Sequence, residues 1–257
     1  MRRIATALVL IPTVLYVIFL GPGWLLATVV CLLAVACFHE YAGIAAAQGM
    51  EFPKWAGQAM GLVFLLTPQP DWRLLVSFAF LAMAVAMRVP DLTRAMPSAS
   101  AMMLGLLYVY GAWRCAFLLR ELSPWWLFFA TGLNWVGDTA ALYSGKAFGK
   151  RKLAPVISPK KTWEGAAGSL VFSMIFGAVL LCRALPDVAI GHAVALSAAT
   201  NIAGQVGDLA ESAMKRGAGV KDSGNLLPGH GGWLDRLDST LFTLPVVAFY
   251  LGWVGWR

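Results

Sequence analysis

Eight ionisable side chains crowd into residues 212–238, between two long apolar stretches. They are Lys215, Arg216, Lys221, Asp222, His230, Asp235, Arg236 and Asp238. A charged side chain at membrane depth costs several kcal/mol unless it is paired or bound to a metal. The residues at 229–232 read Gly-His-Gly-Gly, which gives the segment a flexible turn. This segment is therefore the first candidate for a functional site.

The carboxylates of this region could bind a divalent cation. Asp235 and Asp238 are three residues apart, so they share one helix face. Oxygen ligands from neighbouring helices suit Mg²⁺, which takes one or two carboxylates together with phosphates and water. We expect Asp208, Asp235 and Asp238 to bind Mg²⁺ with Asp138 nearby, and a second metal ion remains an open alternative. For one of the two acids on the last helix, compensation of the helix dipole is a simpler role.

A second basic cluster covers residues 145–165. Its cations are Lys146, Lys150, Arg151, Lys152, Lys160 and Lys161. Prolines in the same stretch prevent a continuous helix. The cluster is either a solvated charge run or part of a phosphate-binding site. Thr162 and Glu164 also have the spacing of a helix start.

Polar residues recur at helical spacing after about residue 130. One stripe holds Thr131, Asn134 and Asp138, and another holds Ser197, Asn201, Gln205, Asp208 and Ser212. In a membrane such stripes face protein or a hydrated cavity, so we expect one polar cavity that opens to the cytoplasm. For Ser197, Asn201 and Gln205, hydrogen bonding between helices is an equal alternative. His39 and Glu40 favour structural pairing over chemistry.

The elements that carry these residues are long apolar runs. The chain has 257 residues, of which 59% are hydrophobic and 13% charged, against about 25% charged in soluble domains. We predict an all-α polytopic membrane protein with about nine transmembrane helices, of which the shortest could be re-entrant. The expected spans lie near 4–20, 24–46, 55–67, 72–88, 99–119, 124–144, 164–185, 189–212 and 233–254.

The chain divides by composition near residue 130. Residues 1–130 are almost wholly apolar and are expected to form a scaffold or a dimerisation surface. Residues 131–257 are expected to form the catalytic region, with cytoplasmic loops at 145–163 and 213–232. Lys and Arg gather in alternate loops, which places these loops and the amino terminus in the cytoplasm of an inner-membrane protein. Residues 20–23, Leu-Gly-Pro-Gly, make a poor signal-peptidase site, so we expect the first span to be retained.

The charged segment resembles the signature of the phosphatidate cytidylyltransferases, also called CDP-diglyceride synthetases or CDP-diacylglycerol synthases. The matching positions are Ser212, Lys215, Arg216, Lys221, Asp222, Gly224, Pro228, His230, Gly231, Gly232, Asp235, Arg236 and Asp238. Trp233 departs from the smaller aliphatic residue usual in that family. The stretch Ser-Pro-x-Lys-Thr-x-Glu-Gly at 158–165, preceded by Asp138, is similar to a second element of the same family. So many fixed positions make a chance match improbable.

The resemblance implies transfer of a cytidylyl group from CTP to phosphatidate, which forms CDP-diacylglycerol and pyrophosphate in phospholipid biosynthesis. The expected catalytic residues are Asp208, Lys215, Arg216, Asp235, Arg236 and Asp238. The expected substrate-binding residues are Ser212, Lys221, Asp222, His230, Gly231, Gly232, Ser158, Lys161 and Thr162. The expected partners are CTP, phosphatidate and the lipid bilayer, without nucleic acid, and a homodimer is an open alternative.

Two other functions compete with this interpretation. A lipid or polyprenol kinase would use a similar metal site and transfer the γ-phosphoryl group instead. A transporter would also carry polar stripes in its helices. A transporter path would need polar residues at both membrane faces, whereas here they crowd towards one. Dependence of the activity on CTP rather than ATP distinguishes cytidylyl transfer from the kinase alternative.

Overall fold

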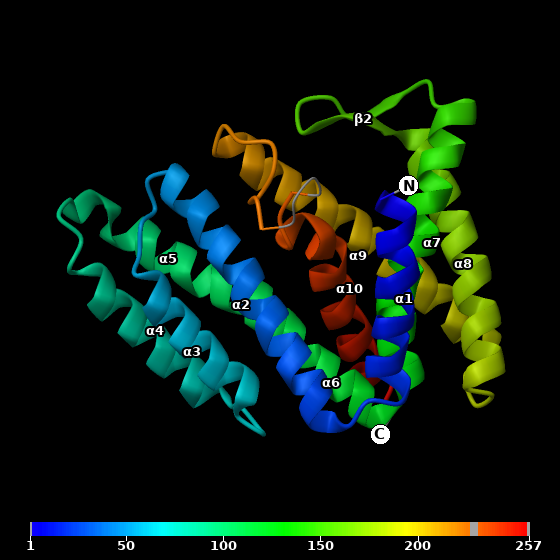
Figure 1. The fold of residues 1–257 in the computed structure, drawn as a ribbon, viewed down its shortest axis with the longest axis horizontal. Helices are drawn as coiled ribbons and strands as arrows, with labels where there is room; N and C mark the ends of the chain where they lie inside the picture. Colours follow the sequence, from blue (N-terminus) through cyan, green and yellow to red (C-terminus); the bar gives the residue numbers. More distant parts are fainter. Residues whose placement is uncertain (1, 227–230, 256–257) are drawn as a thin grey trace.

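The computed structural model describes residues 2–226 and 231–255, and for residues 2–10 only the backbone. The described chain is helical apart from one small hairpin (Figure 1). Its amino-terminal helices are α1 (Arg2–Phe19), α2 (Gly23–Ala47), α3 (Lys54–Leu66), α4 (Trp72–Ala86), η1 (Leu92–Arg94), α5 (Ala95–Gly105), η2 (Leu106–Gly111) and α6 (Ala112–Leu122). Its carboxyl-terminal elements are α7 (Pro124–Phe148), β1 (Lys152–Ala154), β2 (Ser158–Thr162), α8 (Trp163–Ala184), α9 (Ile190–Gly217) and α10 (Leu234–Trp253).

The all-α prediction is confirmed, and three helical stretches have the length and apolar composition to cross a membrane. Within the described residues these are Gly23–Ala47, Leu92–Leu122 and Trp163–Ala184. Helix α3 has 13 residues and is therefore about 20 Å long, shorter than the hydrocarbon core of a bilayer. By length and composition these three stretches are of the membrane-spanning type, whereas a total of nine spans stays a prediction.

The hairpin between α7 and α8 was not predicted. Strands β1 and β2 pair antiparallel, with Lys152 opposite Thr162 and Ala154 opposite Ser158. Pro155 and Pro159 stop the chain from continuing as a helix, and an extended pair is the alternative that satisfies the backbone. The expected loop at 145–163 is therefore shorter at its start, because α7 continues to Phe148. The hairpin projects beyond the ends of α7 and α8 (Figure 1).

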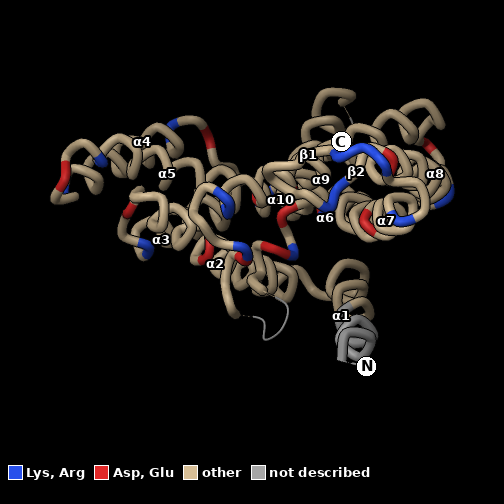
Figure 2. The backbone as a smooth tube through the Cα atoms, turned by 90° about the horizontal axis from the view of Figure 1, so that it is seen from above, with Lys and Arg blue, Asp and Glu red and all other residues tan. Residues whose placement is uncertain are grey.

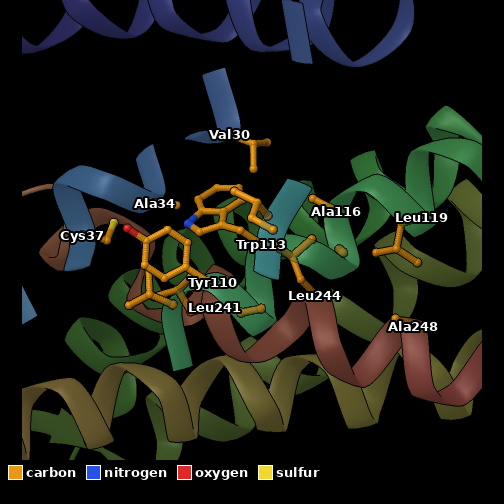
Figure 3. Close-up of a cluster of buried hydrophobic side chains, with 14 of the residues drawn as sticks. Val30, Ala34, Cys37, Tyr110, Trp113, Ala116, Leu119, Leu241, Leu244 and Ala248 are labelled. Atoms are coloured by element: carbon orange, nitrogen blue, oxygen red, sulfur yellow. The ribbon is translucent and has the colours of Figure 1, made fainter. Parts of the chain in front are cut away.

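Helix α10 packs against both halves of the chain. It contacts α7 and α9 on one side and α2 and α6 on the other. A buried apolar cluster fills the junction of α2, α6 and α10 (Figure 3). The labelled members are Val30, Ala34, Cys37, Tyr110, Trp113, Ala116, Leu119, Leu241, Leu244 and Ala248. The amino-terminal helices therefore hold α10 in place directly.

Polar side chains join α7, α8, α9 and α10 in the interior. Asn201 on α9 donates to the hydroxyls of Ser169 and Ser173 on α8, at 2.9 Å each. Gln205 donates to Asn201 Oδ1 at 2.6 Å and to the carbonyl of Ala166. For these two residues of the second stripe, interhelical hydrogen bonding is thus the observed role.

The hairpin and the segment that follows α9 lie at the same end of the helices (Figure 1). Lys and Arg positions mark this end around the hairpin when the molecule is viewed from above (Figure 2). The two charged motifs are far apart in the sequence, and the fold brings them to one end of the carboxyl-terminal helices.

Candidate active site

A polar cavity of about 240 Å³ lies between α7, α9 and α10. Its lining residues are Asn134, Trp135 and Asp138 from α7, Asp208 and Lys215 from α9, and Asp235, Arg236, Asp238, Ser239 and Thr240 from α10. Both polar stripes of the sequence and the pair Asp235 and Asp238 therefore contribute to one cavity. Asn134 is a lining residue that was seen in a stripe but not assigned to the site, and it donates to the hydroxyls of Thr240 and Thr243.

Asp208 connects the cavity to the hairpin. Lys161 on β2 places its Nζ 2.6 Å from Asp208 Oδ2. Ser212, one turn later on α9, donates its hydroxyl to Asp208 Oδ1 at 3.4 Å. The two sequence motifs that resemble one family thus meet at this carboxylate.

Asp138 and Asp238 line the same cavity from the two flanking helices. Asp238 Oδ1 accepts the N–H of Ser239 at 2.7 Å. Several carboxylates around one small cavity repel each other unless cations lie between them. The arrangement therefore favours a cation or a cationic side chain in the cavity.

Asp235 has a different environment, because its carboxylate is already engaged. Lys215 Nζ lies 2.5 Å from Asp235 Oδ1 and 2.6 Å from Glu211 Oε2. Asp235 Oδ2 accepts the N–H groups of Ser223 at 3.0 Å and Gly232 at 2.8 Å. Lys215 and Glu211 are buried, with 9% and 0% of their surface exposed. The expectation that Lys215 is a catalytic residue therefore competes with its observed place in an ion triad with Glu211 and Asp235.

Glu211 is a functional candidate that the sequence analysis missed. It lies four residues before Lys215 on α9, the spacing of an ion pair on one helix face. It also follows Asp208 by three residues, so it continues the polar stripe. The i,i+4 spacing to a lysine was the signal that could have identified it.

The glycine-rich segment before α10 is shaped by its contact with Asp235. Gly231 has φ of +79°, a conformation that L side chains rarely adopt. A Cβ atom at Gly231 would also lie 2.7 Å from Asp235 Oδ2. Glycine is therefore required at 231. His230, expected to bind substrate, and Pro228 lie outside the described residues.

The remaining predicted residues lie around the cavity rather than in its lining. Arg216 donates to the carbonyls of Ile157 and Val220, which ties the hairpin to the end of α9. Lys221 and Asp222 are exposed on the segment after α9. Neither belongs to the residues that line the cavity.

The second motif mainly builds the start of α8. Thr162 Oγ1 accepts the N–H of Gly165 at 3.2 Å and caps the helix. Glu164 accepts the N–H groups of Lys150 and Arg151, which fastens the hairpin to the helix. The simpler role considered for Thr162 and Glu164 is therefore observed. Ser158 begins β2, and of this motif Lys161 alone reaches a lining residue by an ion pair that the structure records.

The donor chemistry of the cavity fits Mg²⁺. Four carboxylates and the oxygens of Asn134, Ser239 and Thr240 line the cavity, and oxygen atoms are the hard ligands that this ion takes. Within residues 2–226 and 231–255, however, no three His, Cys, Asp or Glu side chains are close enough together to hold a metal. The expected ligands Asp208, Asp235 and Asp238 thus line one cavity, but their three carboxylates are not close enough together to bind one ion jointly.

Known proteins resemble this chain along most of its length. A family model described as "Cytidylyltransferase family" matches residues 1–254. A Staphylococcus saprophyticus protein named phosphatidate cytidylyltransferase is 34% identical over 75% of this chain and 77% of its own length. A protein of the same name from Pseudomonas aeruginosa is 42% identical over 60% of this chain and 58% of its own length. The Bacillus subtilis protein of that name is 44% identical, and the match spans about half of each chain, 49% of this one and 47% of the relative.

Proposed function

This chain belongs to the cytidylyltransferase family, and from that membership we propose that it transfers a cytidylyl group from CTP to phosphatidate. The observation that carries the proposal is the polar cavity between α7, α9 and α10, in a chain with apolar helices long enough to cross a membrane. Residues of the first motif line this cavity, and Lys161 of the second motif pairs with its Asp208. The products are CDP-diacylglycerol and pyrophosphate. One substrate dissolves in water and the other in the bilayer, which suits a polar cavity between apolar helices.

The reaction needs positioning more than proton transfer. A phosphate oxygen of phosphatidate attacks the α-phosphorus of CTP, and the bond from that phosphorus to the β-phosphate oxygen breaks. Pyrophosphate leaves with the bonding electrons. Because the attacking oxygen is already anionic, a general base adds little, and the enzyme gains most from alignment and charge neutralisation.

The cations at the cavity would neutralise the phosphates. Arg236 lines the cavity on the first turn of α10, and its planar guanidinium can bind two phosphate oxygens. Lys161 reaches the cavity from the hairpin and can exchange its contact with Asp208 for a phosphate. Lys215 is enclosed by Glu211 and Asp235, so its role is to hold α9 and α10 together at the site.

We propose that one or two of the carboxylates of Asp138, Asp208 and Asp238 bind Mg²⁺, with phosphate oxygens and water as its other ligands. These three carboxylates line the cavity, whereas Asp235 is bound by Lys215 and two backbone N–H groups. When bound at these residues, Mg²⁺ would neutralise charge on the phosphates of CTP and on the leaving pyrophosphate. Asp235 then acts by shaping the segment before α10.

The test of the function is a direct assay with labelled nucleotide. Purified protein is incubated with phosphatidate, Mg²⁺ and either labelled CTP or labelled ATP. We expect label in a liponucleotide from CTP and in no lipid from ATP. Label from the γ-phosphate of ATP in a lipid would identify a kinase instead. Uptake of label into vesicles without a new lipid product would identify a transporter.

The orientation of the protein follows from the same proposal. CTP is made in the cytoplasm, so we propose a multi-pass protein of the cytoplasmic membrane with the cavity opening to that side. The hairpin carries Lys and Arg at the end where the cavity motifs meet, which agrees with the rule that cytoplasmic loops are basic (Figure 2). The homodimer and the division of the chain at residue 130 stay predictions.

Cysteine labelling in intact cells checks this orientation. In a chain whose native cysteines at 31, 37, 115 and 182 are replaced by alanine, Lys152→Cys and Asp187→Cys are compared. Lys152 lies on the hairpin, and Asp187 is exposed between α8 and α9, at the opposite end of those helices. An impermeant maleimide is expected to label Asp187→Cys and to leave Lys152→Cys unlabelled until the cells are opened. The reverse pattern would invert the topology. The distribution of Lys and Arg also places Arg257 at the outer face, but Arg257 is not among the described residues.

A further inference from the structure

A carboxylate from the amino-terminal half reaches the start of the catalytic helix α10. Glu40 lies on α2 and has only 3% of its surface exposed. Its Oε1 accepts the N–H of Trp233 at 3.0 Å, and its Oε2 accepts the N–H of Leu234 at 2.8 Å. Oε2 also accepts the hydroxyl hydrogen of Ser223 at 2.9 Å. Glu40 therefore contacts Ser223, in the segment that joins α9 to α10, as well as the start of α10 itself.

These contacts satisfy a need of α10 itself. The first N–H groups of a helix have no partner within the helix, and an anion at that end is stabilised by the helix dipole. At α10 the residue before the helix, Trp233, provides no side-chain cap. Glu40 provides the cap from 193 residues away in the sequence. The position of this helix start therefore depends on α2.

Two glycines make room for the carboxylate. A Cβ atom at Gly224 would lie 2.7 Å from Glu40 Oε1, and one at Gly232 would overlap Glu40 Oε2. Neither glycine lines the polar cavity. Gly232 was expected to bind substrate, and in the structure the anion beside it is Glu40. The contact with Glu40 of α2 thus explains why positions 224 and 232 are occupied by glycine.

The helix start held by Glu40 carries the residues of the site. Asp235 follows Leu234 directly and binds Lys215. Its carboxylate also accepts the backbone N–H groups of Ser223 and Gly232. Asp238 lies one turn further along the cavity lining. Just beyond, α2 and α10 are joined by the apolar cluster that includes Cys37 and Leu241 (Figure 3). Packing fixes the helix axis, and Glu40 fixes where its first turn begins.

From this geometry we propose that Glu40 is a positioning residue for cytidylyl transfer. Its carboxylate sets the start of α10 and the position of Ser223, so that Asp235, Arg236 and Asp238 are presented to the cavity. The proposal rests on the proposed function for its kinetic part. Its structural part, the dependence of the first N–H groups of α10 on Glu40, is independent of any activity.

The test compares Glu40→Gln with Glu51→Gln, an exposed acid of the same half. Glutamine keeps the size of Glu40 but removes the charge and turns one acceptor into a donor. We expect Glu40→Gln to lower kcat about 10- to 100-fold, the range usual for residues that orient a site, and to change the KM for CTP less than kcat. Hydrogen exchange at the amides of Trp233 and Leu234 is expected to accelerate, while exchange later in α10 stays as in the parent protein. Glu51→Gln is expected to match the parent in both measurements.

A double-mutant cycle separates positioning from general stability. Gly232→Ala displaces the carboxylate and is expected to lower kcat by itself. In the Glu40→Ala background the added cost of Gly232→Ala is expected to shrink. The carboxylate is then gone, and the Ser223 hydroxyl, which the new Cβ would also overlap, has lost this acceptor and can turn away. Parental kcat and parental exchange in Glu40→Gln would overturn the proposal, as would faster exchange along the whole of α10. If the parent protein makes no liponucleotide, the proposed function fails, whereas the exchange result still decides the contact.

Discussion

Asp208→Asn and Asp238→Asn are each expected to lower kcat for cytidylyl transfer by about 10²-fold or more, the usual cost of losing a group that stabilises charge in the transition state. Both carboxylates line the cavity, and asparagine keeps their size while removing the charge. Initial rates at saturating CTP and phosphatidate measure the effect. Asp187→Asn is the matched control, because Asp187 is exposed at the opposite end of α9 and is expected to leave kcat unchanged.

Magnesium titration then separates the ligands from the structural acid. For Asp238→Asn, we expect a higher Mg²⁺ concentration at half-maximal rate and partial recovery at high Mg²⁺. For Asp235→Asn, we expect a lower rate with the Mg²⁺ requirement of the parent, because Asp235 binds Lys215 and backbone N–H groups. A shifted requirement in Asp235→Asn would return this residue to the metal site. An unchanged Mg²⁺ requirement in Asp238→Asn would show that Asp238 is not a metal ligand.

The sequence located the helices well because apolar runs of helical length leave few alternatives. Expected spans such as 24–46 and 164–185 differ from Gly23–Ala47 and Trp163–Ala184 by one residue at each end. Helix α9 differs most at its end, since it continues to Gly217 rather than 212. Gly219, with φ of +70°, follows that end, so the glycine and not the last apolar residue marks the stop.

The site was predicted by residue type but not by partner. Asn201 and Asp208 lie on one stripe, and the sequence left Asn201 open between interhelical hydrogen bonding and the cavity, because it does not show which neighbouring helix a side chain contacts. In the structure Asn201 meets the hydroxyls of α8, and Asp208 meets Lys161 and the cavity. Glu40 was left without a partner for the same reason. Its partners are backbone N–H groups at the other end of the chain, which no spacing rule identifies.

Lys215→Met is expected to lower the free energy of unfolding by about 3–5 kcal/mol, because it leaves two buried carboxylates without their shared cation. The side chains of Glu211, Lys215 and Asp235 are 1%, 11% and 11% exposed, so water cannot replace the lysine fully. In a chain of this size the loss corresponds to a fall in Tm on the order of 10 °C. Thermal unfolding in detergent measures it, and Lys152→Met, an exposed hairpin lysine, is expected to leave Tm unchanged.

A second substitution shows whether the charge is the cause. Glu211→Gln removes the more deeply buried acid, so the pair Glu211→Gln with Lys215→Met leaves one carboxylate, Asp235, which keeps its two backbone N–H donors. We expect this pair to be more stable than Lys215→Met alone, although it changes more residues. Equal or greater loss in the pair would mean that Lys215 stabilises the protein by packing of its aliphatic stem rather than by charge. Recovery of Tm without recovery of kcat would show that the triad stabilises the helix pair and that Lys215 also serves the reaction.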